Sequence, residues 1–399
     1  MPDLDERHLL LQQCCQEWAA DLREHALALE RDPTTVSRLL QLPAVSHSAR
    51  LQIPPPYNPA PLVIGAERFY LTRALERTVF CEAMAWADLG MMLALPGASM
   101  CGVLVDVVGD TRQKEWFYSR ILERPTWTFF ALTEPGGGSD ASAMRTCLRS
   151  GRDSLVLDGA KRYVSNAARA SLGAVFFRAA PGPLGVGAAL VETGTPGFAA
   201  TVIDTMAVRG AQLGAITLDS VQIAPAQILG RGLSPLRRGT WGWLRTFNQL
   251  RPTVASMGVG LAQAAHDYVA ANRRVLRKHE QDRLDELSRR IESVRQITRH
   301  AAIAVDHDPD SAHLAAAAKQ AAAVLAEEAA RQATGFFGPG ARLDHPLLDK
   351  LVRDARALEF MEGTGNIQRL GLAAALSKGA VQADLCGPLG PGAACSPMT

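Results

Sequence analysis

The stretch Phe130–Asp140 reads FALTEPGGGSD, a β-type run that ends in three consecutive glycines. Glycine has no Cβ atom, so the backbone here can approach a bound ligand closely and turn its N–H groups toward an anion. Thr133 and Ser139 add hydroxyl groups that can serve a phosphate or a ring carbonyl. A glycine-rich loop taken alone is usually a plain turn, so its meaning depends on the sequence around it.

The sequence on either side of this loop divides into three blocks. Residues 1–127 carry apolar residues at helical spacing, residues 128–235 are short β-type runs between turn signals, and residues 236–380 are helical again. We therefore predict an α+β multidomain protein with an N-terminal helical domain, a central antiparallel β-barrel domain and a C-terminal four-helix bundle. Residues 381–399 are predicted to form a flexible tail. Because cofactors are common at domain seams, a flat ligand is expected between barrel and bundle.

Composition excludes several classes of protein. The 399 residues are 47% apolar and carry a net charge of only +2, so neither disorder nor nucleic-acid binding is indicated. No apolar run is long enough to span a membrane, and the N-terminal stretch lacks the features of a secretion signal, so a cytoplasmic location is predicted. The seven cysteines form no CxxC pair and the nine histidines no HExxH motif, so no metal site is predicted.

A second motif, Gly159–Asn166, reads GAKRYVSN. Tyr163 and Ser165 are two residues apart, which places them on one face of an extended strand. There Tyr163 could pack against a planar ring while Ser165 reaches a polar atom at the edge of that ring. The alternative is an ordinary barrel strand with no ligand.

A third motif, Phe360–Arg369, reads FMEGTGNIQR and follows the helical segment Leu351–Arg356. Glu362 is thus expected in a turn between two helices, flanked by the apolar Phe360 and Met361. Such surroundings favour a raised pKa through desolvation, which suits a general base. The alternative is a solvated glutamate at a helix end.

These three strings, in this order, resemble the acyl-CoA dehydrogenase family. Its members carry relatives of TEPGAGSD, then a [WY]-[IV]-[TS]-N strand, then EGT-x-x-IQR, and here these read TEPGGGSD, YVSN and EGTGNIQR. The segments Met206–Pro225 and Phe337–Gly340, and Arg251-Pro252 before Gly258–Gln263, are also similar to family elements. The resemblance is good over residues 128–372 and weak up to about residue 60.

The resemblance implies an FAD site, because members of that family bind FAD non-covalently between the β-domain and the bundle. The implied cofactor contacts are Leu132, Thr133, Ser139, Tyr163, Ser165, Gly338, Thr364 and Asn366. Tyr163 would lie beside the isoalloxazine ring and Ser165 near flavin N5. Thr364 and Asn366 would hold the adenosine half, and Gly338 would lie beside the dinucleotide of a neighbouring subunit.

The resemblance also implies a reaction, the α,β-dehydrogenation of an acyl thioester. Glu362 matches the base that takes the α-proton while the β-hydrogen leaves as hydride to flavin N5. Arg251, expected to open a buried helix, would orient Glu362 or tune its charge. Ser139, Arg251 and Gly363 are the implied substrate contacts. The implied partners are acyl-CoA or an acyl-carrier protein, an unidentified electron acceptor, and further copies of this chain in a homotetramer or homodimer.

Two alternatives remain open from the sequence, a flavin-dependent monooxygenase or oxidase on the same fold and a non-catalytic homologue. Some family elements are also missing. The R-x-x-F-G element is absent, and one of Arg273, Arg274 or Arg277 would have to replace it. Such departures favour a specialised member, and we hypothesise that its acyl group arrives on a carrier protein rather than on CoA.

Overall fold

The computed structural model describes residues 4–151, 155–310 and 312–379. Its N-terminal block is a set of helices around one small β-hairpin. Asp5 begins the first helix by accepting the N–H of His8, and Asp110 and Gln113 form a reciprocal cap at the start of the last. Its elements are α1 (Glu6–Arg23), α2 (Ala26–Arg31), α3 (Thr35–Arg38), α4 (Pro43–Ser48), β1 (Leu62–Ile64), β2 (Glu67–Phe69), α5 (Ala74–Ala87), α6 (Leu89–Ala94), α7 (Ser99–Val108) and α8 (Thr111–Glu123).

A single large sheet follows, with strand order β10-β7-β6-β4-β5-β9-β8 and β3 paired to β6. The strands are β3 (Thr128–Ala131), β4 (Cys147–Ser150), β5 (Leu155–Val164), β6 (Leu172–Arg178), β7 (Val186–Glu192), β8 (Phe198–Val202), β9 (Gly214–Ile223) and β10 (Ile228–Leu229). Phe176 of β6 packs with residues of α7 and α8, while Val175 packs with residues of β5 and β9. Both faces of β6 are therefore buried.

The prediction of a closed antiparallel barrel is wrong. The described strands form an open sheet, because β10 and β8 lie at opposite ends of the strand order and do not pair with each other. The sheet is also mixed, since β3 and β4 both pair with β6 in parallel. Turn residues in the sequence predict antiparallel pairs of neighbouring strands. The parallel pairs join strands that are distant along the chain, so no local signal predicts them.

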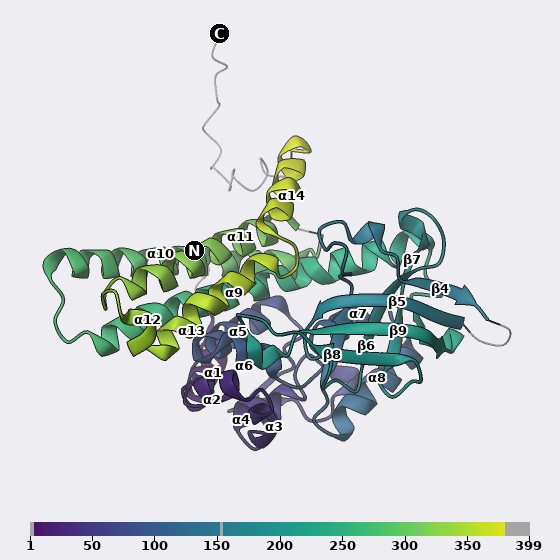
Figure 1. Cartoon of the computed structure of the whole chain (residues 1–399), viewed down its shortest axis with the longest axis horizontal. Coiled ribbons are helices and arrows are strands. Elements are labelled where there is room, and N and C mark those ends of the chain that lie inside the picture. The colour runs from purple at the N-terminus through teal and green to yellow at the C-terminus, as the bar shows by residue number, and fades with distance from the viewer. Residues whose placement is uncertain (1–3, 152–154, 311, 380–399) are drawn as a thin grey trace, which may run out of the picture.

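The C-terminal block consists of three long helices and shorter ones that lead past them: α9 (Thr240–Asn272), α10 (Lys278–His307), α11 (Ala312–Thr334), α12 (Ala341–Asp344), α13 (Pro346–Ala355) and α14 (Gly365–Ser377). Figure 1 shows α9 running from the sheet into the helical layer, with α14 projecting from that layer. The expectation that Arg251 opens a helix is wrong, because α9 begins eleven residues earlier and Pro252 lies inside it. Proline is favoured at a helix start, but packing on both sides of α9 tolerates one here.

One apolar core joins the helices from both ends of the chain. It includes Leu22 of α1, Met84 of α5, Leu261 of α9, Leu325 of α11 and Leu351 of α13. Helix α9 packs against both α5 and α11. The boundaries 1–127, 128–235 and 236–380 stay a prediction, and the predicted tail 381–399 lies outside the described residues.

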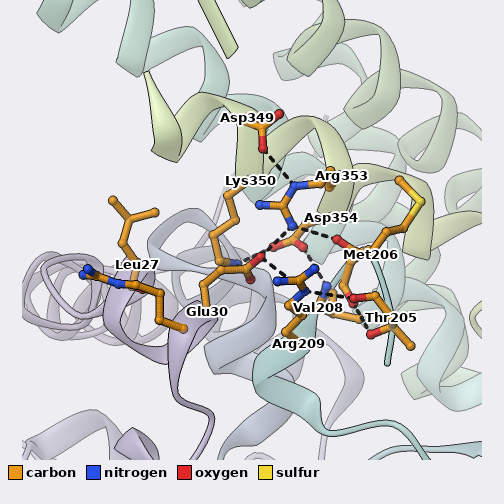
Figure 2. Close-up of polar contacts among 12 residues, drawn as sticks. Leu27, Glu30, Thr205, Met206, Val208, Arg209, Asp349, Lys350, Arg353 and Asp354 are labelled. Carbon is orange, nitrogen blue, oxygen red and sulfur yellow. Dashed lines mark hydrogen bonds and ion pairs between the residues drawn. The ribbon is translucent and has the colours of Figure 1, made fainter. Parts of the chain in front are cut away.

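A buried ionic junction, made of Glu30, Asp88, Lys350, Arg353 and Asp354, fixes α13 against the N-terminal block. Lys350 pairs with Asp88 and Asp354, and all three side chains are about 1% exposed. Glu30 of α2 pairs with Arg353, and Asp354 accepts the backbone N–H of Val208 at 2.7 Å (Figure 2). Because α13 leads into the turn that carries Glu362, the junction fixes the approach to that turn.

Candidate active site

The first two motifs lie side by side, where β3 ends and β5 nears its end. The backbone N–H of Arg162 donates to the carbonyl of Thr133 at 2.9 Å. The fully buried Lys161 donates to the carbonyl of Leu132 at 3.1 Å and pairs with Glu134 at 3.0 Å. Burial lowers the pKa of Lys161 to about 8, although Glu134 opposes that shift. These contacts hold the main chain of Leu132 and Thr133 rigidly at the rim of the sheet.

The glycine-rich loop beyond Thr133 is open to its surroundings. Gly136, Gly137 and Ser139 are exposed, and a Cβ atom added at either glycine would meet no atom within 4 Å. Packing within this chain therefore does not require glycine at these two positions. Gly137 closes a tight turn with Glu134, and the missing side chains leave the backbone open to close approach of a ligand.

The expected shared face of Tyr163 and Ser165 is wrong. Tyr163 has a φ of +60°, and β5 ends at Val164, so the chain is not extended between the two residues. Tyr163 is 56% exposed, and its ring points outward from the strand. The Arg162 guanidinium lies 5.3 Å from the centroid of this ring. A large aromatic ring left so exposed is available to a planar ligand.

The third motif forms the turn between α13 and α14, as predicted. Arg356–Phe360 is one stretch of 3-10 helix, and α14 begins after Thr364. Glu362 has a φ of +46° and Gly363 a φ of +98°, so two consecutive residues are left-handed. For a residue with a Cβ this costs about 1–2 kcal/mol, and such strain persists only where neighbouring groups impose it.

Those neighbouring groups are three donors from three helices. Gln368 of α14 donates to the carbonyls of Glu362 at 3.0 Å and Gly363 at 2.9 Å. Lys319 of α11 donates to the carbonyls of Glu359 at 2.9 Å and Gly363 at 2.8 Å. Arg251 of α9 reaches the Glu362 carbonyl at 3.4 Å.

The Glu362 side chain carries a buried carboxylate. Its Oε2 atom is buried and has no hydrogen-bond partner among the described residues. Burial raises the pKa of Glu362 to about 7, while Lys319 and Arg251 oppose that shift, so the predicted direction is confirmed. Arg251 is itself 8% exposed and donates to Asn248 at 2.7 Å. A carboxylate that titrates near neutral pH is matched to proton abstraction.

Helix α9 connects the sheet side of the site to the Glu362 turn. The ring of Phe130 on β3 lies 6.0 Å from that of Phe247 on α9. Arg251 lies one helical turn further along α9 and contacts Glu362. The structure thus brings all three motifs around one end of α9.

The remaining predicted residues lie further out. Thr364 precedes α14, and the exposed Asn366 accepts from Arg369 at 3.2 Å. Gly338, with a φ of +81°, follows the far end of α11. From Lys319 to that end at Thr334 the helix rises about 22 Å, so this chain does not bring Gly338 to Glu362. A contact from Gly338 to the dinucleotide of a neighbouring subunit stays a prediction.

Three residues of the site were not assigned roles from the sequence: Lys161, Lys319 and Gln368. Lys161 and Gln368 stand inside the quoted motifs, and only their contacts reveal what they do. Lys319 interrupts the alanine run LAAAAKQAAAV. A single lysine within an otherwise small, apolar helix face was the signal available.

The raised pKa of Glu362 has a consequence for stability. A carboxyl whose pKa is higher in the folded than in the unfolded state stabilises the fold at low pH, and this contribution is lost as the pH rises through the folded value. Glu362→Gln should therefore be more stable than the parent at pH 8, by as much as about 3 kcal/mol, and equally stable at pH 4. Urea denaturation at both pH values measures the free energy of unfolding of each protein. The same difference in free energy between variant and parent at pH 4 and pH 8 would contradict this prediction.

Comparison with known proteins finds similar sequences. The family model for the acyl-CoA dehydrogenase middle domain matches residues 129–221, and that for the C-terminal domain matches residues 238–377. A probable acyl-CoA dehydrogenase of Bacillus subtilis, YngJ, is 31% identical over 283 residues, which cover 68% of this chain and 73% of that protein. The human mitochondrial short-chain specific acyl-CoA dehydrogenase is 28% identical over 383 residues, covering 93% and 90% of the two chains.

Solved structures share the fold. Butyryl-CoA dehydrogenase from Megasphaera elsdenii superposes with a TM-score of 0.80 at 24% identity, covering 94% of this chain and 100% of that one. The prolyl acyl carrier protein oxidase AnaB superposes with a TM-score of 0.79 at 20% identity, with the same coverage. The described residues include no helix long and apolar enough to cross a membrane and no cluster of His, Cys, Asp and Glu suited to a metal ion. With two family models matched over more than half its length, this chain belongs to the acyl-CoA dehydrogenase family.

Proposed function

We propose that this chain catalyses the FAD-dependent α,β-dehydrogenation of an acyl thioester, with Glu362 as the base. The observation that carries the proposal is the buried carboxylate oxygen of Glu362, which has no partner among the described residues. A buried polar atom without a partner is rare in a native structure. The α-hydrogen of a substrate would occupy the place that a partner otherwise takes.

The chain's own groups would perform the proton half of the reaction. Glu362 would take the α-proton, and the electron pair of that C–H bond would form the new double bond as the β-hydrogen leaves with its pair. Arg251 and the backbone at Gly363 lie next to Glu362 and would orient the thioester, with Ser139 at its outer arm. Donors fixed before the reaction are effective at a carbonyl oxygen that gains negative charge.

The residues present fit a flavin. Bound FAD would supply the acceptor for the β-hydride. The open backbone of the glycine loop and the exposed Tyr163 ring suit a pyrophosphate and a tricyclic ring. Leu132, Thr133, Tyr163 and Ser165 would hold the ring side of the cofactor, and Ser139 would contact its pyrophosphate or the thioester arm of the substrate. Thr364 and Asn366, with Gly338 of a second copy, would hold the adenosine side.

The carrier of the acyl group is either CoA or an acyl-carrier protein, and relatives of both kinds share this fold. The butyryl-CoA dehydrogenase and the acyl carrier protein oxidase AnaB have similar TM-scores to this chain. A homodimer or homotetramer and an external electron acceptor complete the proposal. A cytoplasmic location stays a prediction.

The proposal is tested by mixing the purified protein with acyl thioesters without oxygen. We expect a yellow protein whose flavin bleaches with at least one thioester in a panel of short, branched and long acyl groups, each offered on CoA and on a carrier protein. A colourless protein would contradict flavin binding. Flavin that bleaches with none of the thioesters but is reduced by NAD(P)H and reoxidised by O₂ would favour the monooxygenase alternative.

A second experiment tests the flavin contact of Tyr163. Tyr163→Ala should weaken FAD binding about three- to tenfold, because aromatic pairs contribute about 0.5–1.5 kcal/mol beyond their buried area. Tyr163→Phe, which keeps the ring, serves as the control and should bind FAD like the parent. The dissociation constant is measured by adding FAD back to the apoprotein. Unchanged affinity in the alanine variant would show that the ring does not pack on the flavin.

A further inference from the structure

A buried lysine lies beneath the Glu362 turn. Lys319 is fully buried on α11, among the buried Ala315, Ala316, Ala322 and Ala323. Removing an ammonium group from water costs several kcal/mol unless hydrogen bonds and opposite charges compensate for it. A lysine on an alanine-rich helix face therefore needs a specific reason, and its contacts supply one.

The ammonium group of Lys319 joins the two ends of the turn. It donates to the carbonyl of Glu359 at 2.9 Å and to that of Gly363 at 2.8 Å. Glu362 lies between these two carbonyls, in its left-handed conformation. Lys319 thus closes the loop of main chain that presents Glu362, from a helix 44 residues away from Gly363.

The charges around the Glu362 carboxylate come from three elements. Lys319 approaches from α11, Arg251 from α9, and Glu359 stands in the same turn, where its carboxylate accepts the N–H of Gly365 at 2.8 Å. In the part of the chain that the structure describes, neither cation donates a hydrogen bond to the Glu362 carboxylate. Lys319 donates to main-chain carbonyls, and Arg251 donates to the side chain of Asn248. They can therefore favour the ionised form of Glu362 while its Oε2 atom stays free.

We propose that Lys319 is a positioning residue for the reaction, which holds the Glu362 turn and favours the charged form of its carboxylate without bonding to it. This inference rests on the proposed function for its effect on rate. It gives the lysine two separable tasks, a hydrogen-bonding one and an electrostatic one. Burial and the two cations act on the Glu362 pKa in opposite directions. Burial also lowers the pKa of Lys319 to about 8, while Glu359 and Glu362 oppose that shift. Lys319 is therefore charged at neutral pH, and removing it should raise the Glu362 pKa.

Two substitutions separate the tasks. Lys319→Gln keeps a donor for the carbonyls but removes the charge, and Lys319→Met removes both. Each should move the midpoint of the pH profile of flavin reduction upward by about one pH unit. On the acidic limb of that profile both variants should then be about tenfold slower than the parent. Lys319→Met should lower the limiting rate further at high pH, because the turn is no longer held.

The matched control is Arg356→Met. Arg356 and Glu327 form an exposed ion pair between the start of the same turn and α11. This variant loosens the same two elements without changing the charge beneath Glu362, and its pH midpoint should equal that of the parent. Lys319→Arg, which keeps the charge, should also keep the midpoint, even if its size slows the reaction.

A measurement without substrate separates this inference from the proposed function. The infrared band of the protonated Glu362 carboxyl, identified by its loss in Glu362→Gln, is titrated with pH in the parent and in Lys319→Gln. A higher midpoint in the variant supports the inference even if no thioester reduces the flavin. The same midpoint in both proteins would overturn it, whatever the rates. If Lys319→Met does not fold, Lys319→Gln and Lys319→Arg still decide the outcome.

Discussion

Glu362→Gln is expected to bind flavin normally and to reduce it about a thousandfold more slowly with an acyl thioester, since a positioned general base contributes about 10²–10⁴-fold. Glutamine has nearly the same shape but cannot take up the α-proton. The backbone contacts that hold the turn, from Gln368, Lys319 and Arg251, involve carbonyl groups and remain. The cofactor contacts are also unchanged, so the protein should stay yellow.

The measurement is the rate at which flavin absorbance bleaches after anaerobic mixing with the best thioester. The control is Glu359→Gln, three residues earlier in the same turn. The Glu359 carboxylate accepts the N–H of Gly365, and the amide oxygen of glutamine can also accept it. The rate of flavin reduction in this variant should therefore fall by less than about tenfold. A Glu362→Gln protein that bleaches at the parent rate would show that another group removes the proton.

Lys350→Met is expected to cause the largest loss of stability, about 3–5 kcal/mol. The methionine fills similar space but leaves Asp88 and Asp354 as buried carboxylates without their shared cation. Burial alone would lower the pKa of Lys350, but these two carboxylates raise it above its usual value. Because that pKa is raised on folding, the pairing stabilises the parent below about pH 10.5 and is lost as the pH rises beyond it.

The pH dependence identifies the mechanism of this loss. Burial raises the pKa of Asp88 to about 6, and Lys350 opposes that shift. In Lys350→Met the Asp88 carboxyl loses this opposition and takes up a proton more readily, so the loss of stability relative to the parent should be smaller at pH 5 than at pH 8. Urea denaturation at both pH values gives the difference. Lys278→Met is the control, because Lys278 pairs with Asp282 at an exposed site, and its denaturation midpoint should match that of the parent. If the free energy of unfolding is lowered equally at both pH values, the cause is lost packing instead.

Much of the architecture was predictable because its signals are local. The blocks of helix, strand and helix follow from hydrophobic period and turn residues, and the turn around Glu362 lies where the motif places it. Local signals failed where long-range pairing decides. The β-type runs predict a barrel, but β3 and β4 pair with β6 in parallel and the sheet stays open. The sequence predicts that Arg251 opens a helix, yet α9 begins at Thr240.

The sequence by itself determined the chemical groups available: the Gly-rich loop, the aromatic and hydroxyl residues after it, and one glutamate in a polar turn. Only the tertiary structure decided how those groups behave. It places Lys319 under a turn 40 to 44 residues away and joins Arg353 to Glu30 across 323 residues. Burial and the field of distant charges set the pKa of Glu362. The physical reason is that both arise from side chains that become neighbours only when the chain has folded.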